Sequence, residues 1–297
     1  MNFAASAWAL TKDTVRGFID DSALSRGASI AYYTVFSIAP VLLIIVAIAG
    51  LVFGHDAAEG AIVGQFSGLM GSSTAQALQE MIKSADNPSA GLVASVVGVV
   101  VLILAATGVF GEVQSAMNAI WKTKPDTSTL SRLVRARLVS LGLVLTSGFL
   151  LTVSLAVSAG LEALSTFVKG LFPGAAVALQ AFDFVISTVL ISGLFAAIYK
   201  MLPDKPIAWR DVAIGALVTT ILFEGGKYLI ALYVSRSNVA SSYGAAGALI
   251  VLLLWIYYTA QIFLLGAEFT YAFAKRYGSH AVSDPPPDEE RPPQPVR

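Results

Sequence analysis

Glu224 and Lys227 lie near the middle of a long apolar stretch, residues 212–234. A spacing of three residues on a helix places both side chains on one face, close enough to pair. Counted from residue 212, the two lie about 18 and 22 Å along the helix, well inside a hydrocarbon core of about 30 Å. The two glycines between them let a neighbouring helix approach closely. Such a pair could contact a charged headgroup or carry a proton.

A charge in the hydrocarbon core is expensive, and a lone one costs from about 3 to more than 10 kcal/mol. We therefore expect Glu224 and Lys227 to pair and to face a bundle interior or water. Three roles stay open. The pair is a buried structural ion pair, or Lys227 reaches outward to the interface, or the pair forms the polar lining of a path for a charged substrate.

Five further polar side chains fall in two other apolar stretches. The helical rise from residues 90 and 244 places Glu112 and Glu268 about 33 and 36 Å along their helices. Both acids would then approach the cytoplasmic interface, where they could simply anchor helix ends. With the central pair, these residues would form a polar path from mid-membrane to the inner leaflet. The five are Glu112, Gln114, Asn118, Gln261 and Glu268.

The inventory of reactive side chains does not favour an enzyme. Metal-assisted phosphodiester cleavage needs clustered carboxylates or histidines, but the only two histidines, His55 and His280, are far apart in the chain. Adjacent Asp20 and Asp21 point to different helix faces, and the absence of cysteine excludes thiolate ligands. A net charge of zero does not indicate a surface that binds nucleic acid. We expect no catalytic residue, no cofactor, no bound metal and no nucleic-acid partner.

The composition indicates a membrane protein. Hydrophobic residues make up 56% of the chain and charged residues only 13%, about half of the charged share in ordinary soluble domains. A helix needs about 20 mostly apolar residues to cross the hydrocarbon core. We predict an all-α fold, a polytopic membrane bundle of six transmembrane helices. The predicted spans are 28–53, 90–120, 139–162, 179–202, 212–234 and 244–274.

The distribution of Lys and Arg sets the orientation, because cytoplasmic connections carry an excess of both. Most of them fall in the amino-terminal arm, the second-to-third and fourth-to-fifth connections, and the tail. The three other connections hold only Lys83, Lys169 and Arg236. Both termini are therefore expected in the cytoplasm.

The segments outside the spans differ in kind. Residues 1–27 are expected to form a cytoplasmic amphipathic helix, ahead of a transmembrane domain over 28–277. The outer loop 54–89 has helical apolar spacing, which predicts short amphipathic helices on the outer leaflet. The tail 278–297 is rich in proline and should be disordered. Pro40 lies inside the first span and should kink that helix.

Several strings resemble the YihY/BrkB family of bacterial inner-membrane proteins, once described as ribonuclease BN. They are GASIAYYTVFSIAPVLLIIVAIAG in the first span, ATGVFGEVQSAMNAIWK at 106–122, FEGGK at 223–227, and SSYGAAGALIVLLLWIYYTAQIFLLGAEFTYAFAKRYG at the end of the transmembrane domain. The resemblance runs from about residue 10 to residue 278. It implies a bundle of six helices with a role in the envelope, variously serum resistance (a virulence trait) or traffic of phospholipid or lipopolysaccharide. It supplies no agreed catalytic site.

We therefore predict a protein of envelope biogenesis that handles or transports an anionic lipid or a similar amphiphile. Membrane lipids would be its partners, with envelope proteins as further candidates. The alternative is a membrane scaffold that positions envelope-building partners without transport. A ribonuclease is the third reading, and the inventory of side chains argues that this description is mistaken.

The predicted topology can be tested with single cysteines, because the natural chain has none. A cysteine at Ser84 should react with a membrane-impermeant thiol reagent from outside, and one at Ser131 only from inside. Labelling of both positions from the same side would contradict the six-span arrangement.

Overall fold

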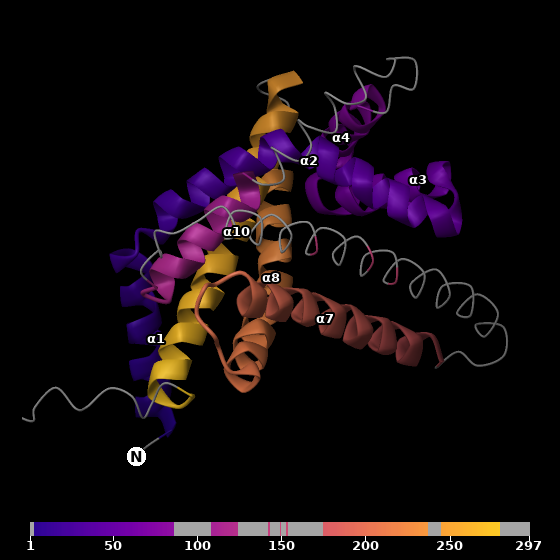
Figure 1. Ribbon diagram of the computed structural model, residues 1–297. Helices are drawn as coiled ribbons and strands as arrows, with labels where there is room; N and C mark the ends of the chain where they lie inside the picture. Colours follow the sequence, from indigo (N-terminus) through magenta and orange to yellow (C-terminus); the bar gives the residue numbers. More distant parts are fainter. Residues whose placement is uncertain are drawn as a thin grey trace, which may run out of the picture.

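The structure is a computed structural model that describes residues 3–85, 108–123, 175–236 and 245–279, together with the single residues 142, 149 and 153. Every element assigned within these ranges is an α-helix, which confirms the predicted fold class for this part of the chain (Figure 1). The helices are α1 (Phe3–Asp20), α2 (Ala23–Phe53), α3 (His55–Met70), α4 (Ser72–Ala85), α7 (Ala175–Met201), α8 (Trp209–Arg236) and α10 (Ala245–Arg276). Residues 108–120 are also helical.

Three of these helices are long and apolar enough to cross a membrane. The stretches that qualify are Phe184–Met201 of α7, Trp209–Val234 of α8 and Ala246–Arg276 of α10. Helix α2 makes a fourth when its two halves count as one span. Four of the predicted spans therefore coincide with described helices.

The other two predicted spans are only partly described. Span 90–120 is seen from residue 108 onward, where it is helical, and span 139–162 falls outside the described residues except for 142, 149 and 153. The tail beyond Ser279 also falls outside them. Six spans and cytoplasmic termini therefore stay predictions.

Helix α2 is bent by 55° between Ala23–Ile38 and Val41–Phe53. Pro40 occupies the break, where it lacks the N–H that would bond to the carbonyl one turn earlier. At the far end of α2, Gly54 adopts a φ of 85°, and Gly71 adopts 88° at the end of α3. Side chains rarely tolerate this backbone conformation, so glycine is required at both corners. Single glycines thus join α2 to α3 and α3 to α4.

The α3–α4 hairpin buries its apolar side chains against its neighbours. Ile62 and Met70 of α3 and Leu78 and Ile82 of α4 join a cluster that also contains residues of α2, α8 and α10. Inside the hairpin, Gln79 donates a hydrogen bond of 2.7 Å to Glu59. The helical spacing that predicted amphipathic helices is therefore present, and its apolar side is used for packing within the protein.

Helix α1 lies beside the last third of α10 and runs antiparallel to it (Figure 1). Arg276 forms an ion pair of 3.1 Å with Asp13, and Gly17 packs against Glu268. The helix ends at Asp20, and Ser22 turns the chain into α2 with a φ of 55°. The predicted amino-terminal helix is thus shorter than residues 1–27, and α2 starts before residue 28.

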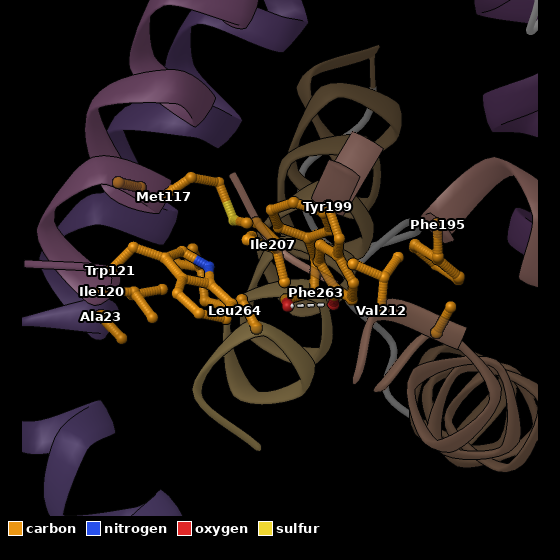
Figure 2. Close-up of a cluster of buried hydrophobic side chains, with 14 of the residues drawn as sticks. Ala23, Met117, Ile120, Trp121, Phe195, Tyr199, Ile207, Val212, Phe263 and Leu264 are labelled. Carbon is orange, nitrogen blue, oxygen red and sulfur yellow. Dashed lines mark hydrogen bonds between the residues drawn. The ribbon is translucent and has the colours of Figure 1, made fainter. Parts of the chain in front are cut away.

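A second core cluster joins residues 108–123 to α2, α7, α8 and α10 (Figure 2). Trp121 and Tyr199 are fully buried in it. The Tyr199 hydroxyl donates a hydrogen bond of 2.7 Å to the carbonyl of Phe263 and lies 3.0 Å from the hydroxyl of Thr219. The two large aromatic side chains therefore stabilise this junction through close packing and through the hydrogen bonds of the Tyr199 hydroxyl.

Helices α8 and α10 pack closely because glycines stand where they touch. A methyl group on Gly215 would lie 2.7 Å from Cβ of Thr270, and one on Gly266 would lie 2.6 Å from the Tyr199 hydroxyl. Thr219 and Thr270 satisfy their own hydroxyls by donating to carbonyls one turn earlier, at 2.7 Å each. The contact is therefore tight in volume, and the hydroxyl groups of both threonines are hydrogen-bonded.

Two glycines of α8 offer a matched test of this packing. Gly215→Ala should lower the free energy of unfolding by about 1–3 kcal/mol, because the buried Thr270 leaves no room for a methyl group. Gly225→Ala should leave stability unchanged or slightly raised, since nothing lies within 4 Å of that position and alanine favours helix. Thermal unfolding in detergent would compare the two, and equal midpoints would contradict the close packing.

Candidate functional site

Glu224 and Lys227 form the ion pair that their spacing predicts. The ammonium Nζ of Lys227 lies 2.9 Å from Oε1 and 2.8 Å from Oε2 of Glu224. The side chains are 25% exposed for Lys227 and 16% exposed for Glu224. Contact with both carboxylate oxygens makes this a strong, charge-assisted interaction. The pair is sheltered, and it is still reachable from outside the protein.

The pair sits at the edge between the packed face and the outward face of α8. On the packed side, a methyl group on Gly226 would lie 2.5 Å from Ile262 and 2.8 Å from the Tyr258 hydroxyl of α10. On the outward side, Tyr228 and Leu229 are 75% and 65% exposed. A ligand that approached along the outward face would therefore meet both charges without entering the core.

Phe223 links the pair to the rest of the bundle. Its ring lies 5.7 Å from the Lys227 ammonium, within the range of a cation–π contact. The same ring contacts Phe195 of α7 at 5.8 Å and Trp255 of α10 at 6.1 Å, both edge-on. The orientation of Lys227 is thus coupled to three helices.

The depth of the pair follows from its register against α10. Gly226 faces Ile262 and Tyr258, which precede Glu268 by six and ten residues, or about 9 and 15 Å of helix. Glu268 lies in the polar end of the bundle, which we define by Asp21, Lys122, Asp204, Asp211 and Glu268. The pair therefore lies about 9–15 Å from the level of Glu268, measured along α10.

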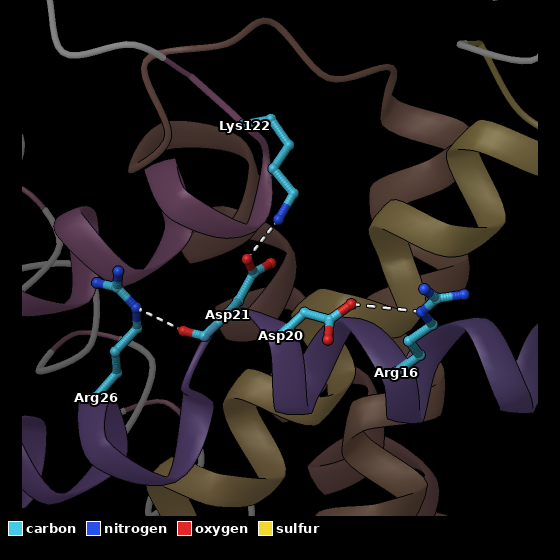
Figure 3. Close-up of polar contacts among 5 residues, drawn as sticks. All are labelled: Arg16, Asp20, Asp21, Arg26 and Lys122. Carbon is cyan, nitrogen blue, oxygen red and sulfur yellow. Dashed lines mark hydrogen bonds and ion pairs between the residues drawn. The ribbon is translucent and has the colours of Figure 1, made fainter.

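Glu268 is one of the most deeply buried polar residues, with 2% of its surface exposed. It packs against Gly17 of α1, close to the turn that contains Asp21. Asp21 in turn pairs with Lys122 (Figure 3). Glu268 thus helps to fix the turn between α1 and α2 against α10.

The charges around this turn divide into an inner and an outer set (Figure 3). Asp21 faces inward to Lys122, and its carbonyl accepts a 2.9 Å hydrogen bond from Arg26. Asp20 pairs with Arg16 at 3.5 Å on the exposed side. The two adjacent acids therefore point to different sides, as predicted. Ser22 and Lys122 both adopt left-handed backbone conformations, so the ion pair of Asp21 with Lys122 joins two tight turns.

Asn118 and Gln114 form hydrogen bonds with the loop between α7 and α8. Both side-chain amides donate to the carboxylate of Asp204, at 2.8 and 3.2 Å, and Asn118 accepts a 2.9 Å hydrogen bond from the Asp204 backbone. Asp211, which is buried, accepts 3.0 and 2.7 Å hydrogen bonds from the backbone and hydroxyl of Ser279. These contacts tie together the ends of the helices.

The seven polar candidates do not converge on one site in the described part of the chain. Gln261 packs against Gly27 and donates a 3.4 Å hydrogen bond to the carbonyl of Leu24. Glu112 is half-buried, and none of the contacts among described residues joins it to the central pair. Gln114, Asn118, Gln261 and Glu268 act as helix-end contacts, which leaves Glu224 and Lys227 as the candidate site.

Sequence reasoning missed the partners that complete these contacts, namely Asp204, Asp211 and Tyr199. The positions of glycines were the sequence feature that could have indicated these contacts. Gly17, Gly266 and Gly278 each leave room for a polar side chain, from Glu268, from Tyr199 and from Asp211 respectively. Glycine identity alone does not reveal which polar group fills the space.

Breaking the pair on one side should expose the cost of an uncompensated charge. Lys227→Met leaves the Glu224 carboxylate without its partner, and should reduce the free energy of unfolding by about 2–4 kcal/mol. The double variant Glu224→Gln with Lys227→Met should recover most of the loss. Thermal unfolding of the single and double variants forms a cycle, and strictly additive changes would show that the side chains do not interact.

The sequence is similar to known bacterial membrane proteins. A UPF0761 membrane protein of Ralstonia nicotianae is 30% identical over 263 residues, covering 87% of this chain and 57% of the relative. One from Vibrio vulnificus is 28% identical, covering 83% and 76%. One from Pseudomonas paraeruginosa is 29% identical, covering 84% and 59%. The chain thus spans little more than half the length of two of these relatives.

No solved structure matches the chain. The family model described as "Virulence factor BrkB" matches residues 14–291, nearly the whole sequence. This match confirms the resemblance seen in the first and last apolar stretches. The long apolar helices and the match across the chain show that this is a membrane protein of the BrkB family.

Proposed function

We propose that this protein binds and moves an amphiphile with a charged headgroup in the bacterial inner membrane, and that Glu224 and Lys227 contact the headgroup. The observation that carries the proposal is an ion pair in which the Lys227 ammonium contacts both carboxylate oxygens of Glu224, at the edge of the outward face of an apolar helix. The protein would serve envelope biogenesis, with both termini in the cytoplasm and no catalytic step.

The energetics of a purely structural pair argue for a ligand. Replacing a sheltered ion pair with apolar side chains of similar size is often neutral or stabilising. Structure alone therefore gives little reason to keep Glu224 and Lys227 in an apolar helix. A charged headgroup gives such a reason, because it needs charges where the surrounding side chains offer none.

The surroundings of the pair suit the rest of an amphiphile. Large apolar side chains continue along the outward face of α8, and Ile221, Tyr228 and Leu229 are each more than half exposed. Acyl chains could lie along this face while the headgroup reaches the pair. The pair lies about 9–15 Å from the level of Glu268, a distance that a headgroup would cover on its way from the polar end.

A membrane scaffold is the second candidate, and exposed apolar residues of α7 favour it. Phe182, Phe184, Val185 and Val189 are each more than half exposed, and this half of α7 points away from α8 (Figure 1). An apolar helix of a partner protein could cover this surface. In that case the ion pair would be a structural element of the bundle and would have no ligand.

The double variant Glu224→Gln with Lys227→Met separates the two candidates. It should fold, fail to restore envelope integrity in a strain that lacks the protein, and lose a class of lipid that copurifies with the natural chain. Gly225→Ala, on the same helix with nothing nearby, is the matched control and should behave like the natural chain. Normal complementation by a folded double variant, with the same copurifying lipids, would favour the scaffold.

A further inference from the structure

We infer that the headgroup recognised by Glu224 and Lys227 is a zwitterion that joins a phosphate to a primary ammonium, as in phosphoethanolamine lipids. This inference rests on the proposed function and narrows its ligand from charged amphiphiles in general to one class. It starts from the charge of the site. One carboxylate and one ammonium in mutual contact sum to zero.

Helices α8 and α10 supply no further charge near the pair. Along α8 the nearest ionisable residues with formal charge are Asp211 and Arg236, which lie about 20 and 14 Å away along the helix. Helix α10 has its first charged residue at Glu268, about 9 Å beyond Ile262. On these two helices, Glu224 and Lys227 are therefore the charges that a ligand at this position meets first.

An anionic headgroup is poorly matched to this site. Its phosphate would draw Lys227 away from Glu224 and leave the carboxylate without a partner beside another negative charge. An uncompensated charge in a sheltered place is costly, and this cost disfavours the wrong ligand. A net-neutral pair therefore discriminates against a net-negative headgroup.

A zwitterionic headgroup lets every charge keep a partner. Its phosphate can take Lys227 while its ammonium takes Glu224, so the closed pair opens into two new pairs. A primary ammonium has three N–H donors for the carboxylate, whereas a quaternary ammonium such as choline has none. The Phe223 ring lies 5.7 Å from the Lys227 ammonium. It provides an aromatic face that can contact the ammonium of Lys227 or the ammonium of the headgroup. The site therefore favours ethanolamine over choline.

The exposure of the two side chains allows this exchange of partners. Both are partly exposed at the edge of the outward face, so a headgroup can reach them without disturbing the contact of Gly226 with α10. The spacing of three residues leaves each charge on its own flexible side chain. Opening the pair requires only rotation of these side chains.

Native mass spectrometry of the full-length protein in detergent would test this inference. Phosphatidylethanolamine, phosphatidylglycerol and phosphatidylcholine with identical acyl chains would be offered at equal concentration. The natural chain should retain phosphatidylethanolamine over phosphatidylglycerol by about tenfold, the value of one charge-assisted hydrogen bond. Retention of phosphatidylcholine should also be lower than that of phosphatidylethanolamine.

Glu224→Gln is the decisive variant, because it leaves a single positive charge at the site. Its preference should reverse in favour of phosphatidylglycerol. The matched control is Asp20→Asn, which removes a negative charge from an exposed pair in the polar end and should leave the preference unchanged. Equal shifts in both variants would indicate a general charge effect and would overturn the inference.

A double variant with the two charges exchanged is a control for misfolding of the single variant. Glu224→Lys combined with Lys227→Glu keeps the ion pair and its zero net charge, and should keep the preference for phosphatidylethanolamine. Equal or stronger retention of phosphatidylglycerol by the natural chain would overturn the inference while leaving a lipid site intact. If the double variant Glu224→Gln with Lys227→Met retained every lipid like the natural chain, the proposed function itself would fail.

Discussion

The close contact between α8 and α10 is the constraint on which the rest of the described structure depends. It is the most extensive contact between described helices, and it is possible because Gly215, Gly226 and Gly266 replace side chains at the points of contact. In a membrane, apolar surface gains little from leaving lipid, so association depends on packing and hydrogen bonds. The threonines and Tyr199 at this contact supply both.

Because α8 lies so close to α10, the position of the ion pair along the bundle and the direction in which it points are fixed. Gly226 faces Tyr258 and Ile262, and this orientation turns Glu224 and Lys227 toward the edge of the contact. Had a larger residue stood at Gly226, α8 would be displaced and the pair would lose its shelter. The polar end completes the arrangement by fastening α1, the helix that ends near Trp121, and the α7–α8 loop.

The sequence was sufficient for features that depend on local spacing. Apolar length predicted α2, α7, α8 and α10, and three-residue spacing predicted the contact between Glu224 and Lys227. Contacts between distant segments were not predictable, because the partner of Asn118 is Asp204 and the partner of Asp211 is Ser279. The local sequence pattern also did not distinguish Gly225 from Gly226, although only Gly226 packs against another helix.

The single-residue corners at Gly54 and Gly71 have a mechanical consequence. Helix α3 follows the second half of α2 with no loop between them, and the α3–α4 hairpin packs against that same half. Beyond the bend at Pro40, the segment Val41–Phe53 is about 20 Å long. Its buried side chains share one apolar cluster with the hairpin, α8 and α10. A change in the bend would have to break this packing, so the cluster and the tight corners together hold the two halves of α2 at a fixed angle.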